Sequence, residues 1–153
     1  IAVDAYRTDK PEHVDELMPI NQLNELMRRS DVVMIACPLT NETQELINAG
    51  NLALMKPTAY FINVARGPIV DQNALTDVLR QGKIAGAGLD VTEIEPLEKD
   101  SPLWDMENVI ISPHVAGVSQ RRLPRLVEFF CGNLKKYMAD EPLDKVVHKD
   151  RGF

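Results

Sequence analysis

The sequence predicts an α/β domain in which helices flank a parallel sheet. Short apolar runs alternate with amphipathic stretches along the chain. Several of these runs are continuously apolar, which is typical of strands covered on both faces, whereas half-buried strands alternate apolar and polar residues. Parallel strands need crossover connections, and the amphipathic stretches between the runs suit helices. These observations together favour a parallel sheet with crossover helices.

The predicted strands are the short apolar runs at residues 1–3, 32–37, 59–64, 84–91 and 109–112. In the fourth run, Leu89 continues the strand after Gly86 and Gly88, so we expect these glycines to allow close backbone packing rather than to form a phosphate-binding turn. A doubly wound sheet normally opens with a strand that leads into a glycine-rich turn. We expect that part to be missing here, so the predicted fold is an incomplete doubly wound (Rossmann-like) parallel sheet with flanking helices.

Two amphipathic stretches predict helices with one apolar face. Residues 20–29 are apolar at positions 20, 23, 26 and 27, and residues 71–81 are apolar at positions 74, 75, 78 and 79. This spacing follows one face of a helix. Asp71 is a typical N-cap and Gly82 typically follows a helix end, so the second helix has signals at both ends.

Two further stretches predict less regular helices. Residues 41–55 are expected to form one helix broken near Gly50, or two short helices, ending before Pro57. The longest helix is expected within residues 119–139, where Pro124 should make its start irregular or kinked. Both predictions depend on a glycine or proline within an otherwise helical pattern.

Composition and charge exclude several classes of protein. With 17 basic and 23 acidic residues, the 153-residue chain has a formal charge of −6, so nucleic acid is not expected as a general partner. No apolar run approaches the roughly 20 residues that cross a bilayer, and we expect a protein of the cytoplasm. Cys37 and Cys131 lie in apolar surroundings without CxxC spacing, which predicts buried free thiols. The sequence contains no metal-ligand cluster.

An arginine directly follows one of the apolar runs. Arg66 lies beside Gly67 and Pro68 just after the run at 59–64. A guanidinium group is a planar fork of donors that matches a carboxylate, and α/β sheets bind ligands at the carboxyl ends of their strands. An arginine at this place therefore indicates an anion-binding site. With Glu95 and His114 downstream, it indicates an enzyme that acts on a small carboxylic acid.

The chain resembles the carboxyl-terminal part of the D-isomer-specific 2-hydroxyacid dehydrogenases. The motifs that carry the resemblance follow the family's order and are Val3-Asp4-Ala5-Tyr6, Pro38-Leu39-Thr40-Asn41-Glu42-Thr43, Asn63-Val64-Ala65-Arg66-Gly67, Gly88-Leu89-Asp90-Val91 through Glu95-Pro96-Leu97, and Ser112-Pro113-His114-Val115-Ala116-Gly117. The resemblance implies an NAD-dependent oxidoreductase that interconverts a D-2-hydroxy acid and a 2-oxo acid. It also implies a partial NAD-binding domain at residues 1–140 and a tail at 141–153 that would return to an absent substrate domain.

The resemblance assigns catalytic roles to three residues. Arg66 would bind the substrate carboxylate, His114 would exchange a proton with the C2 oxygen, and Glu95 would hydrogen-bond the histidine. Histidine suits this task because its ordinary pKa lies near neutrality. The family's acid precedes a proline, so Pro96 selects Glu95 rather than Glu93. Related formate dehydrogenases have a glutamine in place of this acid, so the Glu–His pair favours a hydroxy-acid substrate.

The resemblance also assigns residues to the cofactor. Asp4 matches the acidic residue that binds the ribose hydroxyls and repels a 2′-phosphate, which favours NAD over NADP, although Arg7 and Lys10 follow closely and would suit that phosphate. The other cofactor-binding positions, which include the catalytic arginine and histidine, are Pro38, Thr43, Ala65, Arg66, Asp90, His114 and Gly117.

Alternatives to an active enzyme stay open. Corepressors similar to this family keep the Arg, Glu and His, so a non-enzymatic NAD-responsive interaction protein is one alternative, and a structural remnant without cofactor is another. Without its central strand the chain is expected to expose apolar surface and unpaired strand edges, which would impair activity and favour association. The expected partners are a small 2-hydroxy or 2-oxo acid and a second subunit in a homodimer, with no membrane.

Overall fold

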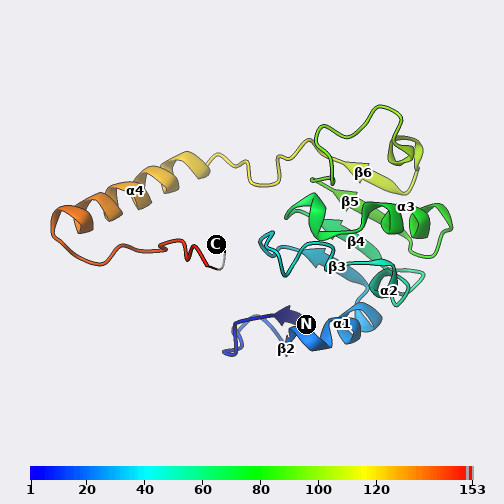
Figure 1. Cartoon of the computed structure of the whole chain (residues 1–153), viewed down its shortest axis with the longest axis horizontal. Coiled ribbons are helices and arrows are strands. Elements are labelled where there is room, and N and C mark those ends of the chain that lie inside the picture. Colours follow the sequence, from blue (N-terminus) through cyan, green and yellow to red (C-terminus); the bar gives the residue numbers. More distant parts are fainter. Residues whose placement is uncertain (151, 153) are drawn as a thin grey trace. The chain divides into compact units, whose positions relative to one another are not determined.

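The computed structural model describes residues 1–150 and 152, and the chain divides into two compact units, Ile1–Pro113 and His114–Phe153. The first unit contains two parallel sheets (Figure 1). The smaller sheet pairs β1 (Ala2–Asp4) with β2 (Leu17–Pro19). The larger sheet has the order β3-β4-β5-β6, with strands at Val32–Ile35, Tyr60–Asn63, Gly86–Leu89 and Val109–Ile111. The predicted parallel α/β fold is confirmed.

Short helices connect the strands, as parallel pairing requires. The first helical segment joins β2 to β3, the second lies between β3 and β4, the third lies between β4 and β5, and a last turn precedes β6 (Figure 1). In chain order they are η1 (Ile20–Gln22) with α1 (Leu23–Arg29), α2 (Ala49–Leu52), η2 (Gly67–Ile69) with α3 (Gln72–Arg80), and η3 (Pro102–Asp105). The predicted helices at 20–29 and 71–81 are therefore present, the former beginning as a 3-10 turn.

The two ends of α3 follow the signals in the sequence. The Asp71 carboxylate accepts a hydrogen bond from the backbone N–H of Ala74 at 2.9 Å, so Asp71 is the N-cap. Gly82, just past the helix, has a φ of +62°, a left-handed conformation that glycine adopts without strain. Asp71 therefore fixes the N-terminal end of α3, which follows η2 along the chain.

The core of the first unit lies under one face of the larger sheet. Val33 on β3 and Phe61 on β4 are buried, and they belong to one apolar cluster with Leu75 and Leu79 of α3. These helix residues lie on the apolar face that the periodicity predicted. Burial of this stripe anchors α3 on the sheet, because each such side chain contributes about 1.5–3 kcal/mol when removed from water.

The first glycine of β5 is required by close packing. A Cβ atom on Gly86 would lie 2.5 Å from the carbonyl oxygen of Asn108, so only glycine fits without a shift of backbone. The prediction that the glycines of this strand serve close backbone packing is confirmed at Gly86.

The opposite face of the larger sheet is exposed. Val32 and Met34 on β3 are 56% and 61% exposed, and Ile110 on β6 is 76% exposed. Burial alternates along β3, so the prediction that this strand is covered on both faces is wrong within the residues described. In the same part of the chain, β1 pairs with β2 alone and β3 with β4 alone. The first unit therefore presents apolar surface and open strand edges, among them those of β1 and β3.

Residues 41–55 form less helix than predicted, because their backbone makes other hydrogen bonds. The α-helix in this stretch is limited to α2. Before it, the N–H of Ile47 donates to the carbonyl of Ile69, and the N–H of Asp71 donates to the carbonyl of Ile47. This short parallel bridge keeps the chain extended at Ile47, so the predicted helix is wrong up to that residue.

The second unit is described by itself and contains the longest helix, α4 (Arg122–Met138). Pro124 lies in its first turn, where the missing N–H would have had no partner within the helix, so the helix starts just ahead of the proline. The tail contacts α4 through Asp144, whose N–H donates to Asn133 Oδ1 at 2.9 Å and whose carboxylate lies 2.6 Å from Lys136 Nζ. In the described residues no helix is long and apolar enough to cross a membrane.

Candidate functional site

Several predicted site residues follow the carboxyl ends of strands in the larger sheet. Pro38 comes soon after β3, Arg66 after β4, and Asp90 directly after β5. Because β3, β4 and β5 are parallel neighbours, their carboxyl ends share one edge of the sheet. This edge is where an open α/β sheet binds its ligand.

A buried asparagine fixes the turn that carries Arg66. Asn63 is 2% exposed, and its side-chain oxygen accepts from the N–H of Ala65 at 3.0 Å while its side-chain nitrogen donates to the carbonyl of Arg66 at 3.1 Å. The Arg66 side chain is exposed and donates through Nη1 to the carbonyl of Ala65 at 2.6 Å. The backbone is therefore held by the core while the guanidinium group faces solvent. Asn63 was not among the predicted site residues, although a polar residue at the end of an apolar run is a signal in the sequence.

The loop after β5 holds Glu95 by local hydrogen bonds. The N–H of Thr92 donates to Glu95 Oε1 at 3.2 Å, and the Thr92 hydroxyl donates to the carbonyl of Ile94 at 2.8 Å. Thr92 is buried, whereas Glu95 is exposed. The carboxylate is thus anchored on one oxygen by the backbone of its own loop.

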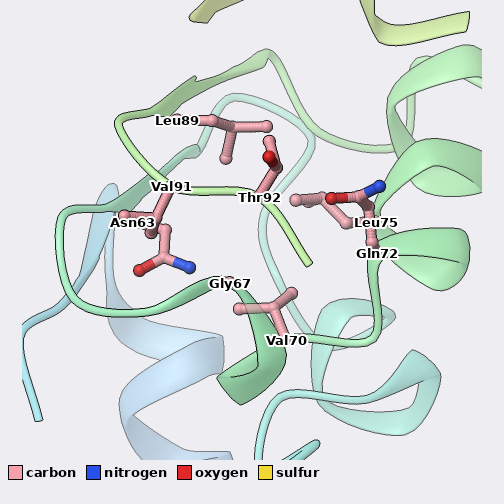
Figure 2. Close-up of a pocket in the computed structure, with 8 residues that line it drawn as sticks. All are labelled: Asn63, Gly67, Val70, Gln72, Leu75, Leu89, Val91 and Thr92. Atoms are coloured by element: carbon pink, nitrogen blue, oxygen red, sulfur yellow. The ribbon is translucent and has the colours of Figure 1, made fainter. Parts of the chain in front are cut away.

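The turn of Arg66 and the loop of Glu95 pack against each other. A Cβ atom on Gly67 would lie 1.8 Å from the carbonyl oxygen of Thr92, so the two backbones touch at this point. Both segments border a small pocket, about the size of a water molecule, that Figure 2 shows. It is lined by Asn63, Gly67, Val70, Gln72, Leu75, Leu89, Val91 and Thr92. Two of the three predicted catalytic residues are therefore brought together on adjoining segments.

Asp90 is buried at the end of β5. It is 5% exposed, and its Oδ1 accepts from the Ser112 hydroxyl at 2.6 Å. The N–H of Ser112 in turn donates to the carbonyl of Leu89 at 2.9 Å. Asp90 therefore ties the end of β5 to the residue that follows β6, the strand that leads toward His114.

At the end of β1, Asp4 is held by its own turn. Its Oδ1 accepts from the N–H groups of Tyr6 and Arg7, both at 2.8 Å. These two backbone donors lower the pKa of the Asp4 carboxyl below its ordinary value, so the group is ionised at neutral pH. Arg7 is itself engaged by Asp9, with its Nη2 2.8 Å from Asp9 Oδ2.

The segment after β3 is ordered by a threonine hydroxyl. Thr43 Oγ1 donates to the carbonyl of Pro38 and accepts from the N–H of Thr40, both at 2.7 Å.

Cys37, just before Pro38, is half-buried, and burial raises the pKa of its thiol, which agrees with an unreactive cysteine. Cys131 is also free but exposed, so the prediction that both thiols are buried is wrong at Cys131.

The remaining predicted residues, His114 and Gly117, belong to the second unit. Both are exposed, and His114 has a φ of 54°, an uncommon conformation for a residue with a side chain. A Cβ atom on Gly117 would meet no described atom of its own unit within 4 Å, so packing within that unit does not require this glycine. The first unit therefore contains Arg66 and Glu95, whereas the histidine belongs to the second unit.

The described residues include no group of three or more His, Cys, Asp or Glu side chains that could hold a metal ion.

A parallel sheet with an acidic residue after one strand and polar groups along its carboxyl edge is the arrangement of a dinucleotide-binding domain. The sequence model of the "D-isomer specific 2-hydroxyacid dehydrogenase, NAD binding domain" matches residues 1–116. The chain belongs to this family of oxidoreductases.

Curated relatives and solved structures agree with this assignment. The chain is 44% identical to a glyoxylate reductase of Thermofilum pendens over 133 residues, which are 87% of this chain and 39% of that protein. It is 36% identical to a hydroxypyruvate reductase of Blautia hydrogenotrophica over 146 residues, 95% of this chain and 45% of that protein. The chain therefore spans less than half the length of these curated relatives.

Two solved structures show the same fold. A D-isomer specific 2-hydroxyacid dehydrogenase from Xanthobacter autotrophicus, in complex with NADPH and MES, has a TM-score of 0.80 and 40% identity over 95% of this chain and 61% of that one. An NADPH-dependent glyoxylate/hydroxypyruvate reductase from Sinorhizobium meliloti, in complex with NADP and sulfate, has a TM-score of 0.85 and 28% identity over 99% of this chain and 48% of that one. The family thus includes relatives that were crystallised with the phosphorylated cofactor.

The polar groups of the first unit fit part of a dinucleotide. The ionised Asp4 carboxylate suits the hydroxyls of a ribose, and the exposed Pro38 segment follows the next strand edge. No glycine-rich turn leads directly from a strand into a helix in the described residues. The described residues therefore offer a group for the ribose at Asp4 and an exposed segment at Pro38 after β3. They include no turn of the kind that binds a pyrophosphate.

Proposed function

We propose that this chain is part of an NAD-dependent enzyme that interconverts a D-2-hydroxy acid and a 2-oxo acid. The observation that carries the proposal is the contact between Gly67 and Thr92, which packs the turn of Arg66 against the loop of Glu95 at the carboxyl edge of the sheet. An anion-binding fork and a carboxylate on adjoining rigid segments suit the chemistry of a small keto acid. The names of the relatives, glyoxylate and hydroxypyruvate reductases, support the same substrate class.

In the proposed reaction each residue has one task. Arg66 binds the substrate carboxylate through two parallel hydrogen bonds and so orients C2. His114 donates a proton to the C2 oxygen during reduction and removes it during oxidation, and Glu95 holds the imidazole in the orientation for that transfer. When bound, the nicotinamide cofactor supplies or accepts the hydride at C2.

The proposed cofactor is NAD rather than NADP. Asp4 is ionised and would repel a 2′-phosphate. Arg7, the first cationic side chain after Asp4 in the sequence, is paired with Asp9 through Nη2, and its Nε donates to the carbonyl of Asp9 at 2.9 Å. The remaining assignments at Pro38, Thr43, Ala65, Asp90 and Gly117, like the homodimer and the cytoplasmic location, stay predictions.

Steady-state kinetics on the protein at the length its gene encodes would test the proposal. Glyoxylate, hydroxypyruvate and larger 2-oxo acids would be offered with NADH and with NADPH, and wild type would be compared with His114→Gln. We expect reduction of at least one 2-oxo acid, with a loss of roughly 10²- to 10⁴-fold in kcat for the variant. A wild-type protein that binds NADH but reduces none of the acids would instead favour a non-enzymatic, cofactor-responsive role.

A further inference from the structure

We propose that Gln72 is a positioning residue for the reaction, because it fixes the loop of Glu95 relative to the turn of Arg66. The inference rests on the proposed function, which gives Arg66 and Glu95 their roles. It concerns a residue of α3 that neither the motifs nor the comparisons single out. The evidence is a hydrogen bond between parts of the chain that are far apart in sequence.

Gln72 reaches from the start of α3 to the loop after β5. Its Oε1 accepts a hydrogen bond from the backbone N–H of Glu93 at 2.9 Å, across 21 residues of sequence. Figure 2 shows Gln72 beside Leu75 at the edge of the small pocket that Thr92 also lines. The acceptor is therefore supplied by a different element from the one that carries Glu95.

The anchor of this hydrogen bond is rigid. Gln72 is the first residue of α3 and directly follows the N-cap Asp71, whose carboxylate fixes the first turn. Leu75 and Leu79 of the same helix are buried in the core. A side chain at this position has a fixed base from which to hold a loop.

The loop is attached to the rest of the unit at several points. Its internal hydrogen bonds join Thr92 to Glu95 and Thr92 to Ile94, so they shape the loop but do not attach it to the rest of the unit. Attachment includes the contact of Thr92 with Gly67, the packing of Leu97 against the core and the hydrogen bond of Glu93 to Gln72. The links through Thr92 and Glu93 join the residues just before Glu95 to the turn of Arg66 and to α3.

The exposure of Glu93 separates a positioning role from a role in stability. Glu93 is exposed and Gln72 is half-buried, so water can replace the lost acceptor when Gln72 is changed. Loss of the bond should therefore leave the fold intact and allow the loop to move. In the proposed reaction Glu95 supports proton transfer, whereas Arg66 binds the substrate and its turn is still held by the hydrogen bonds of Asn63. The substitution should therefore lower kcat and leave KM for the 2-oxo acid largely unchanged.

The test compares three variants of the protein at the length its gene encodes. Gln72→Met keeps the size of the side chain but lacks the acceptor, and Gln72→Glu keeps an acceptor oxygen. Asn73→Met, at the next position of α3, is the control. The Asn73 side chain is exposed and makes no hydrogen bond among the described residues. We expect Gln72→Met to lower kcat about 5- to 20-fold with KM changed less than about twofold, and Gln72→Glu to recover most of kcat. Asn73→Met should behave as wild type.

Nuclear magnetic resonance of the Glu93 amide supplies a readout independent of activity. Its proton shift and exchange rate should change in Gln72→Met and return toward wild type in Gln72→Glu. An unchanged Glu93 amide, or an active enzyme whose kcat is the same in Gln72→Met, would overturn this inference while leaving the proposed function standing. A wild type that reduces no 2-oxo acid would instead overturn the proposed function and, with it, the catalytic role of this contact.

Discussion

Gly67 and Thr92 touch through their backbones, so closely that a Cβ atom on Gly67 would lie 1.8 Å from the Thr92 carbonyl oxygen and 2.5 Å from the N of Glu93. The contact joins the segment after β4 to the segment after β5. It is also the point where Arg66 and Glu95, which are distant in sequence, come to lie on adjoining segments. The requirement for glycine at position 67 is therefore steric.

The first prediction is that Gly67→Ala destabilises the first unit. The added methyl group overlaps backbone atoms, which cannot rotate away as a side chain would, and we expect a loss of at least about 2 kcal/mol in the free energy of unfolding. Urea unfolding followed by circular dichroism measures it. Gly132→Ala in α4, where a Cβ meets no described atom within 4 Å, is the control and should be neutral or stabilising. Equal stability of both variants would refute the steric explanation.

The second prediction concerns the N-cap of α3. Asp71→Ala removes the oxygen that accepts from the N–H of Ala74, and we expect a cost of about 1 kcal/mol. Asp77→Ala on the same helix removes an exposed pair with Arg80 and should cost less than about 0.5 kcal/mol. Denaturant midpoints of both variants give the comparison, and a larger loss for Asp77→Ala would contradict the capping role.

The third prediction is a change of cofactor preference. Asp4→Ser removes the ionised carboxylate that would face a 2′-phosphate, so the ratio of kcat/KM for NADPH to that for NADH should rise about tenfold or more. Asp15→Ser, at an exposed aspartate in the following loop, is the control and should leave the ratio unchanged. If wild type already prefers NADPH, the assignment of Asp4 is wrong.

The fourth prediction is that a polypeptide of these 153 residues associates with itself. The edge strand β3 presents Val32 and Met34, and exposed apolar edges of this kind pair with other chains. Light scattering should show a mass that rises with concentration, and Met34→Lys should reduce the rise. Asn73→Lys, at an exposed position of α3, should not reduce it. A monomeric mass at every concentration would contradict the prediction.

Local signals in the sequence predicted much of the first unit. The spacing of apolar residues located α3, and Asp71 and Gly82 located its ends. The stretch at 41–55 failed because a backbone bridge from Ile47 to Val70 competes with helix, and such a bridge depends on a distant segment. β2 was not predicted because its three residues, ending in Pro19, are too few to show a period.

The candidate site was predictable in its residues but not in its supports. Motif resemblance singled out Arg66 and Glu95, whose side chains are the chemically distinctive ones. Asn63 and Gln72 act through hydrogen bonds to backbone groups, and a sequence carries little record of such pairs. The contact of Gly67 with Thr92 could not be predicted for the same reason. A backbone contact between separate segments is marked in the sequence only by the glycine itself.

The most direct test of the account is the KM of Arg66→Lys for the 2-oxo acid that the wild-type protein reduces best. A lysine keeps the charge but offers no planar fork, so we expect kcat/KM for the acid to fall roughly 10- to 100-fold, mainly through KM, while KM for NADH changes little. Arg80→Lys, whose arginine pairs with Asp77 on the exposed side of α3, is the matched control and should match wild type. An Arg66→Lys enzyme with an unchanged KM for the acid would contradict the assignment of Arg66 to the substrate carboxylate.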